Sequence, residues 1–154
     1  MFSKYVERNY RDWVEQTSGR PVLSTEIVDR YLLPELQGGK SVFFFVIDCL
    51  RLDQWMVMEE LLRDYFTISK EYYFSILPTA TPYSRNAIFS GSFPSDVELR
   101  FPELWEMSED DESSRNRYER QFLEKLLERR KVVLRPEPKY IKILDAEFGR
   151  TIEN

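Results

Sequence analysis

The first third of the chain alternates apolar and charged residues at the spacing of α-helices. Across residues 3–17, aromatic and valine side chains recur every three or four positions with charges between them, which predicts an amphipathic helix. A Gly-Arg-Pro sequence then ends this helix. A second helix is expected to start at Ser24–Thr25, whose hydroxyls suit an N-cap, and to carry apolar residues as far as Leu32.

The next stretch changes from a helical period to the pattern of a buried strand. Residues 41–47 (SVFFFVI) are mostly Val, Phe and Ile, which is typical of a strand covered on both faces in a parallel sheet. A helix is predicted over residues 52–65 and a second strand over residues 72–77. Thr81 as N-cap and Pro82 as the first helical residue predict the start of a further helix, which Gly91 ends. This order predicts a βαβα unit.

The remaining pattern is less regular and determines the predicted fold class. Residues 108–117 lack apolar side chains and predict an exposed loop, residues 117–131 predict a helix, and residues 140–144 predict a short strand. We expect an α/β fold, with a partial doubly wound, mostly parallel sheet and flanking helices. Residues 1–39 are interpreted as a helical lead-in. Residues 40–154 are interpreted as an incomplete domain, because a two-strand core needs more sheet to cover its apolar surface.

Composition narrows the functional classes. The chain has 22 Lys and Arg against 27 Asp and Glu, a net charge of −5, so we expect no duplex-DNA binding. Its single cysteine points to a cytoplasmic, reducing setting. The absence of histidine excludes a serine or cysteine triad with a histidine base in this chain. The longest apolar run is far shorter than the roughly 20 residues of a membrane helix, so no membrane association is expected.

Two residues occupy places where α/β proteins bind ligands. Asp48 follows the first predicted strand, where a carboxylate can hold a metal ion. Thr81 begins the helix after the second strand, where the helix dipole favours an anion and a metal can activate the hydroxyl as a nucleophile. One βα unit separates them, which brings both to one edge of the sheet and favours a site over two ordinary helix caps. Thr79 is the alternative to Thr81 as the reacting group.

Neighbouring side chains are secondary candidates. Arg85 and Asn86 follow Thr81 in its helix, and either could donate a hydrogen bond to a phosphoryl oxygen; surface solvation or packing is an equally open interpretation. Arg51 and Asp53 are expected to be structural. Cys49 is expected to face the core as a small hydrophobe.

The stretches VFFFVIDCLRLDQW (42–55) and SILPTATPYSRNAIFSGSFPSD (75–96) together resemble the PglZ domain of the alkaline phosphatase superfamily. The resemblance is greatest to the PorX-type response regulators of the Bacteroidetes, in which a helical linker joins a receiver domain to a C-terminal PglZ domain. It is most specific across residues 40–96 and weaker over 5–38. It implies that the chain carries the N-terminal part of such a domain.

The resemblance also implies an activity. The resemblance implies a zinc phosphodiesterase with two zinc ions. It implies that Asp48 is a metal ligand, and that Thr81 is both a metal ligand and the nucleophile that attacks phosphorus. The implied substrates are phosphodiesters in cyclic or linear oligonucleotides. The implied setting is two-component regulation of type IX secretion, with a sensor kinase or sigma factor as partner.

The chain departs from the superfamily in its ligands, because the other metal ligands there are Asp and His residues and this chain has no His. The isolated chain, as a fragment of the enzyme, is therefore expected to lack zinc-dependent hydrolysis. The alternative is a non-catalytic PglZ-like module whose exposed apolar surface binds a partner or forms a homodimer. A receiver or Rossmann nucleotide fold is disfavoured, because the strand–helix junctions lack a Gly-rich phosphate loop.

Overall fold

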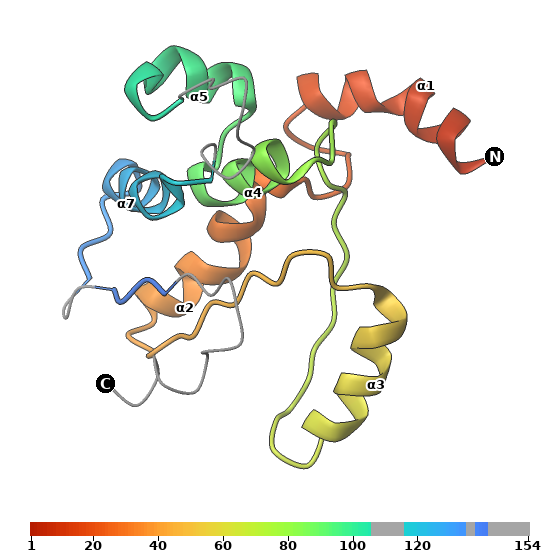
Figure 1. The fold of residues 1–154 in the computed structure, drawn as a ribbon, viewed down its shortest axis with the longest axis vertical. Coiled ribbons are helices and arrows are strands. Elements are labelled where there is room, and N and C mark those ends of the chain that lie inside the picture. Colours follow the sequence, from red (N-terminus) through yellow and green to blue (C-terminus); the bar gives the residue numbers. More distant parts are fainter. Residues whose placement is uncertain (106–115, 135–137, 142–154) are drawn as a thin grey trace.

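The computed structural model describes residues 1–105, 116–134 and 138–141, and these residues form helices joined by extended segments (Figure 1). The predicted helices over 3–17, 52–65, 81–90 and 117–131 are confirmed, with bounds that shift by a few residues. The elements in chain order are α1 (Phe2–Glu15), the 3-10 turn η1 (Ser24–Glu26), the π-helical turn η2 (Val28–Leu32), α2 (Leu33–Gln37), α3 (Leu52–Leu62), α4 (Thr81–Ser90), α5 (Pro94–Arg100), the 3-10 turn η3 (Pro102–Leu104) and α7 (Glu119–Arg129).

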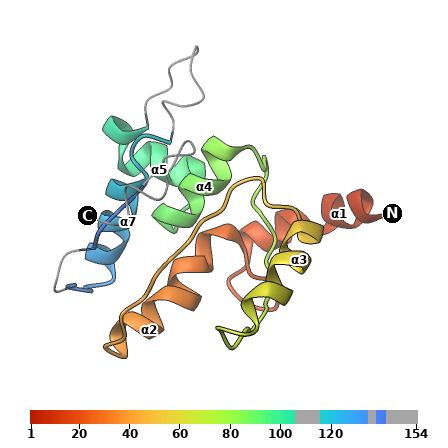
Figure 2. The same ribbon diagram turned by 60° about the horizontal axis from the view of Figure 1, so that its bottom comes forward.

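Helix α4 lies at the centre of the packing. It contacts η1, α5 and α7, and Figures 1 and 2 both show it between α7 and the turn that leads into η1. One apolar cluster joins η2 and α2 to α7 through Val28, Leu32, Leu33, Leu126 and Leu127, all of them buried. Burial of side chains of this size stabilises a fold by about 1.5–3 kcal/mol each. This packing fixes α7 against η2 and α2.

The two ends of α4 are set by local chemistry. Ala80 is the N-cap, Thr81 is the first helical residue, and Pro82 follows in the position where its missing N–H is tolerated. The expectation that Thr81 itself caps the helix is therefore wrong by one residue. Gly91 ends the helix as predicted, with φ 59° in the left-handed region. A Cβ atom built there would lie 2.9 Å from Leu126 Cδ1, so the glycine also permits close contact with α7.

The predicted parallel sheet is not confirmed by the described residues. Residues 41–47 are extended, but they pair with no strand in this part of the structure. Phe44 and Val46 pack against the core, whereas Phe43, Phe45 and Ile47 are 86%, 71% and 55% exposed. Alternate residues of an extended chain point to opposite sides, so only one side of this segment is covered. The expectation of cover on both faces is wrong for the described residues.

The second predicted strand makes one β-contact. Phe74 forms an isolated parallel bridge with Leu23, and its N–H donates to the Val22 carbonyl at 2.8 Å. The next N–H along the same side, that of Ile76, donates to Ser24 Oγ at 3.1 Å. Residues 72–77 therefore pair with the chain around η1 rather than with residues 41–47.

Helix α1 and the segment after it pack on the same core. Trp13 is buried in a cluster with Leu23, Ile76 and Ala87. The Tyr10 hydroxyl accepts the Leu77 N–H at 2.7 Å, which ties α1 to the segment that precedes α4. The division between a lead-in over 1–39 and a domain over 40–154 stays a prediction.

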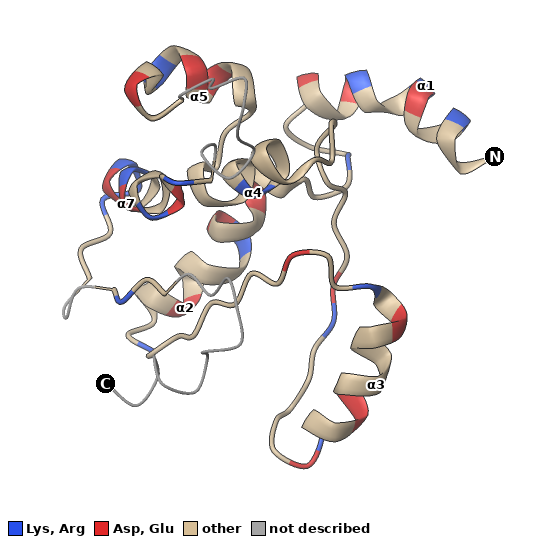
Figure 3. Cartoon of the chain, in the orientation of Figure 1, with Lys and Arg blue, Asp and Glu red and all other residues tan. Residues whose placement is uncertain are grey.

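Helix α3 is held mainly by the chain on either side of it, and Figure 1 shows it away from α2, α4 and α7. Glu59 is its buried residue and accepts hydrogen bonds from Arg63 at 2.8 Å and Lys70 at 2.7 Å. Arg63 and Lys70 lower the pKa of the Glu59 carboxyl, in that order of effect. Tan segments beside α3 in Figure 3 show that the flanking extended chain is mostly uncharged.

Two further findings bear on the predictions. Among the described residues, no helix has the length and apolar character needed to cross a membrane. The loop predicted for 108–117 and the strand predicted for 140–144 lie largely outside the described residues; Tyr140 and Ile141 are described and belong to no helix or strand.

Candidate active site

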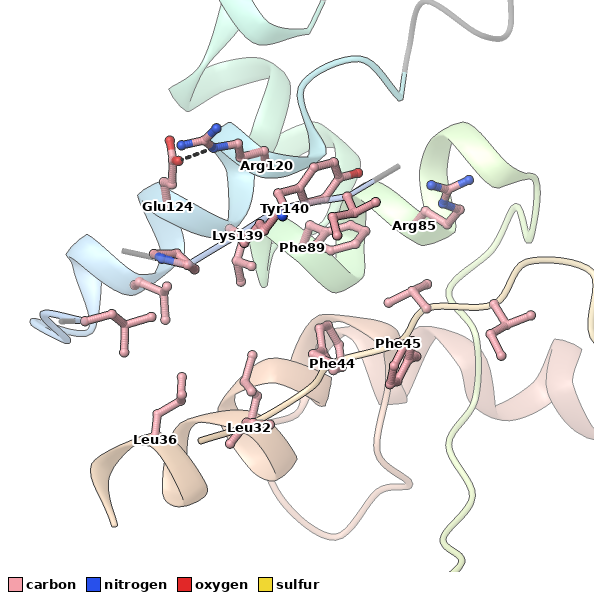
Figure 4. Close-up of a pocket in the computed structure, with 18 of the residues that line it drawn as sticks. Leu32, Leu36, Phe44, Phe45, Arg85, Phe89, Arg120, Glu124, Lys139 and Tyr140 are labelled. Carbon is pink, nitrogen blue, oxygen red and sulfur yellow. Dashed lines mark hydrogen bonds and ion pairs between the residues drawn. The ribbon is translucent and has the colours of Figure 1, made fainter. Parts of the chain in front are cut away.

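A cavity of about 570 Å³ lies between α2, the extended residues 42–48, α4, α7 and residues 138–141 (Figure 4). Its walls are apolar over most of their extent, with Leu32, Phe44 and Phe89 among the lining side chains. Polar groups from several elements also line the cavity, and Figure 4 shows Arg85 projecting from α4, apart from Arg120 and Glu124 on α7. A concave apolar site with a few polar groups is typical of small-molecule binding.

Asp48 and Arg85 meet at this cavity. The Asp48 Oδ2 atom lies 3.5 Å from Arg85 Nη1, and both residues line the cavity wall. Asp48 does not cap the next helix, because the N-cap of α3 is Arg51; its Oδ1 instead accepts the Cys49 N–H at 2.8 Å. The side chain of Asp48 is 40% exposed and that of Arg85 is 20% exposed. The structure therefore brings two of the predicted site residues together.

Thr81 lies on the same helix as Arg85, four residues earlier. This spacing places both residues on one face of α4. Thr81 is half-buried, whereas Thr79 is exposed in the turn before the helix, where its carbonyl accepts the Ser84 hydroxyl at 3.2 Å. The choice between Thr81 and Thr79 as the reacting group stays open, and the helical position gives Thr81 the shared face with Arg85.

The N-terminus of α4 offers few backbone donors to an anion. The N–H groups of Tyr83 and Ser84 both donate to the Ala80 carbonyl at 3.0 Å, and Pro82 has no N–H. A phosphoryl group at this end of the helix would depend on side-chain donors more than on free backbone N–H groups. Arg85 is the cationic side chain on this face that lines the cavity.

Arg85 has a second acidic partner that the sequence analysis missed. Its Nη2 donates to Glu119 Oε2 at 2.6 Å, and the Tyr140 hydroxyl donates to the same oxygen at 2.7 Å. Glu119 is fully buried at 0% exposure. Burial, followed by the hydrogen bond to Glu119, raises the pKa of Tyr140. One signal was available: Glu119 stands three and seven positions before Phe122 and Leu126, on the apolar face of the predicted helix.

The other sequence candidates lie elsewhere. Asn86 is 2% exposed and lies inside the packing of α4, away from the cavity lining. Arg51 and Asp53 pair with one another at 2.9 Å at the exposed start of α3, which agrees with a structural role. Cys49 is exposed, with φ 57°, so the expectation that it faces the core is wrong. Cys49 lies in a turn formed by residues 48–49, between the extended segment and α3.

The described residues do not fit a metal centre by themselves. No group of three His, Cys, Asp or Glu side chains with metal-binding geometry is found in the described part of the chain. Asp48 stands as a single carboxylate here, and its closest cationic neighbour is the Arg85 guanidinium. Zinc is held by three or four protein ligands in its usual sites. Asp48 could supply one of these, and further ligands would be required.

Comparison with protein-family models matches residues 27–145 to one family, described as the BREX system PglZ alkaline phosphatase-like domain. The matched region includes the cavity residues Asp48, Arg85 and Tyr140, together with Glu119 and Thr81, which do not line the cavity. A search of curated proteins gives no match to the chain.

Proposed function

The chain belongs to the PglZ alkaline phosphatase-like family, and on that premise we propose that it carries part of the active site of a phosphoester-cleaving domain. The family suggests an α/β architecture and a phosphoesterase-type function, and the alkaline-phosphatase-like superfamily usually depends on metal ions. The observation that carries the proposal is the convergence of Asp48 and Arg85 at one end of the cavity, on the face of α4 that includes Thr81.

Each of these residues has a proposed role. The Arg85 guanidinium donates hydrogen bonds to phosphoryl oxygens, because its planar set of N–H groups matches the geometry of a phosphate. The Thr81 hydroxyl oxygen forms the new bond to phosphorus and releases its proton while the ester P–O bond breaks, and the departing ester oxygen takes up a proton from water and leaves as an alcohol. Asp48 contributes one carboxylate to a metal site, with two zinc ions as the proposed metals and the remaining ligands supplied from outside the described residues. Because Asp48 alone cannot complete a metal site, we propose that the isolated chain is inactive.

We also propose a substrate and a biological setting for this domain. A phosphodiester within an oligonucleotide is the proposed substrate, and attachment to a PorX-type response regulator in the cytoplasm is the proposed setting. Support for these statements is the sequence resemblance across residues 40–96.

A second candidate function is favoured by one observation. Phe43, Phe45 and Ile47 are exposed and form an uncovered apolar edge on an extended segment that pairs with no strand among the described residues; Phe45 and Ile47 also line the cavity. Exposed extended segments of this kind associate with other chains. A non-catalytic module that binds a second copy of this chain is therefore the alternative.

Binding of inorganic phosphate tests the proposed site directly. We expect phosphate to shift the amide resonances of residues 81–85 in a ¹⁵N NMR titration of the full chain. Arg85→Ala should weaken this binding by about tenfold or more, because it removes a charge-assisted hydrogen bond. Arg120→Ala is the matched control: Arg120 also lines the cavity but pairs with Glu124 on its own helix at 2.7 Å. Equal losses in the two variants would contradict a specific role for Arg85.

A further inference from the structure

Glu119 is the buried acidic partner of Arg85. It is the first residue of α7, and its fully buried Oε2 accepts both the Arg85 Nη2 group and the Tyr140 hydroxyl. A buried carboxylate is costly unless a cation and further hydrogen bonds compensate it. Two donors converge on a single oxygen here, and they come from α4 and from residues 138–141.

The contacts on the two sides of the guanidinium are unequal. The Nη2–Oε2 distance to Glu119 is 2.6 Å, whereas the Nη1–Oδ2 distance to Asp48 is 3.5 Å, at the outer limit of a hydrogen bond. Asp48 is also the more exposed partner, at 40% against 0% for Glu119. The Arg85 guanidinium therefore makes a close contact with Glu119 and a longer contact with Asp48.

This asymmetry leaves Arg85 with N–H groups that neither Glu119 nor a close contact with Asp48 uses. A guanidinium has five N–H groups, and the contact with Glu119 uses one nitrogen. Arg85 Nε is buried and has no hydrogen-bond partner within the described residues. An oxyanion that approached past Asp48 would find a cation whose orientation is already fixed, which reduces the entropic cost of binding.

We propose that Glu119, supported by the Tyr140 hydroxyl, is a positioning residue that holds the Arg85 guanidinium at the cavity so that its remaining N–H groups face a phosphoryl oxyanion. The inference rests on the proposed phosphoester function for the identity of the anion. The competing explanation is that Glu119 merely neutralises a buried arginine. The two explanations predict opposite effects of removing its charge.

The variant Glu119→Gln distinguishes the two explanations, because they predict opposite changes in phosphate affinity. If Glu119 acts only as a charge, its removal leaves the Arg85 cation less neutralised and inorganic phosphate binds more tightly. If Glu119 positions Arg85, phosphate binding weakens about fivefold or more despite the loss of a negative charge, because the guanidinium is no longer fixed. Glu124→Gln is the matched control. It removes the same charge from the same helix, at a residue that lines the cavity and pairs with Arg120 rather than with Arg85, and it should leave phosphate affinity unchanged or slightly increased.

A second measurement does not depend on phosphate. Side-chain ¹⁵N NMR of the arginines reports rotation of each guanidinium, and we expect restricted rotation of Arg85 in the parent chain and in Glu124→Gln. Rotation should become free in Glu119→Gln and faster in Tyr140→Phe, which removes one hydroxyl and keeps every charge. Tyr140→Phe carries the test if Glu119→Gln does not fold, as judged by circular dichroism.

The outcomes distinguish the two proposals. Unchanged Arg85 rotation in both variants, or a gain in phosphate affinity for Glu119→Gln that equals or exceeds that of Glu124→Gln, overturns the positioning role. Restricted Arg85 rotation that is lost in Glu119→Gln, in a parent chain that binds no phosphate at millimolar concentration, supports the positioning role and overturns the phosphoester function.

Discussion

At the scale of single residues, the pairing of Tyr140 with Glu119 makes a testable link between pH and stability. Burial and the Glu119 carboxylate raise the pKa of Tyr140 above the ordinary value near 10. A raised pKa means that the folded state favours the neutral phenol. Its contribution is complete below about pH 10 and is lost as the pH rises above that value.

Tyr140→Phe should therefore reduce stability by about 1.5–3 kcal/mol at pH 8, the typical contribution of a hydrogen bond to a charged group. The difference between the variant and the parent chain should shrink as the pH is raised above about 10. Urea unfolding at several pH values measures both effects. A difference that stays constant across this range would show that the phenol of Tyr140 does not titrate differently in the folded state.

Gly91 supplies a second residue-level prediction. Gly91→Ala should destabilise the fold by about 2–3 kcal/mol, since alanine disfavours a left-handed backbone and its Cβ would press on Leu126. Gly19→Ala is the control, because Gly19 has φ 72° but no atom within 4 Å of an added Cβ, and it should cost about 1–2 kcal/mol. Equal costs in urea unfolding would mean that Leu126 moves aside without penalty.

At the scale of elements, the packing of α7 on η2 and α2 should dominate stability. Leu126 is fully buried in the cluster that joins them, so Leu126→Ala should cost about 2–5 kcal/mol in urea unfolding. Leu99→Ala on α5 is the matched control, since Leu99 is 81% exposed, and it should change stability by less than about 0.5 kcal/mol. A small effect at Leu126 would indicate that α7 packs weakly on its neighbours.

The helices could be predicted from the sequence because their signals are local. Apolar spacing, a Thr-Pro start and a Gly stop define α4 within ten residues of chain. The sheet could not be established in this way. A run of apolar residues indicates that a segment is to be covered, but it does not identify the segments that cover it. Phe44 found cover in the helical core, whereas Phe43 and Phe45 did not.

The candidate site shows the same division. Thr81 and Arg85 could be placed on one helix face from their spacing alone. The contact between Asp48 and Arg85 depends on how an extended segment packs beside α4, and sequence spacing does not encode that geometry. Glu119 was overlooked because a glutamate in a first helical turn is usually explained by the helix dipole, although here it is buried between α4 and Tyr140.

At the scale of the whole molecule, the uncovered apolar edge predicts self-association. We expect light scattering to show oligomers of the parent chain that increase with concentration, because Phe43 and Phe45 are exposed on a segment with unpaired backbone among the described residues. The double variant Phe43→Ser and Phe45→Ser should shift the chain towards monomer. Leu99→Ser, which removes an equally exposed side chain on α5, should not.

A monomeric parent chain at all concentrations would contradict the interaction module and leave the phosphoester function as the better supported of the two. Oligomers that persist in the double serine variant would place the contact elsewhere on the molecule.

The outward turn at Cys49 gives the chain a chemical handle. It is the single cysteine of the sequence, its side chain is exposed, and its N–H is bonded to the Asp48 carboxylate. A thiol-reactive fluorophore would therefore attach at one place, one residue from the cavity, with no engineered mutation. Its emission would report any ligand that displaces Asp48 from Arg85, including ligands that the chain binds without turning over.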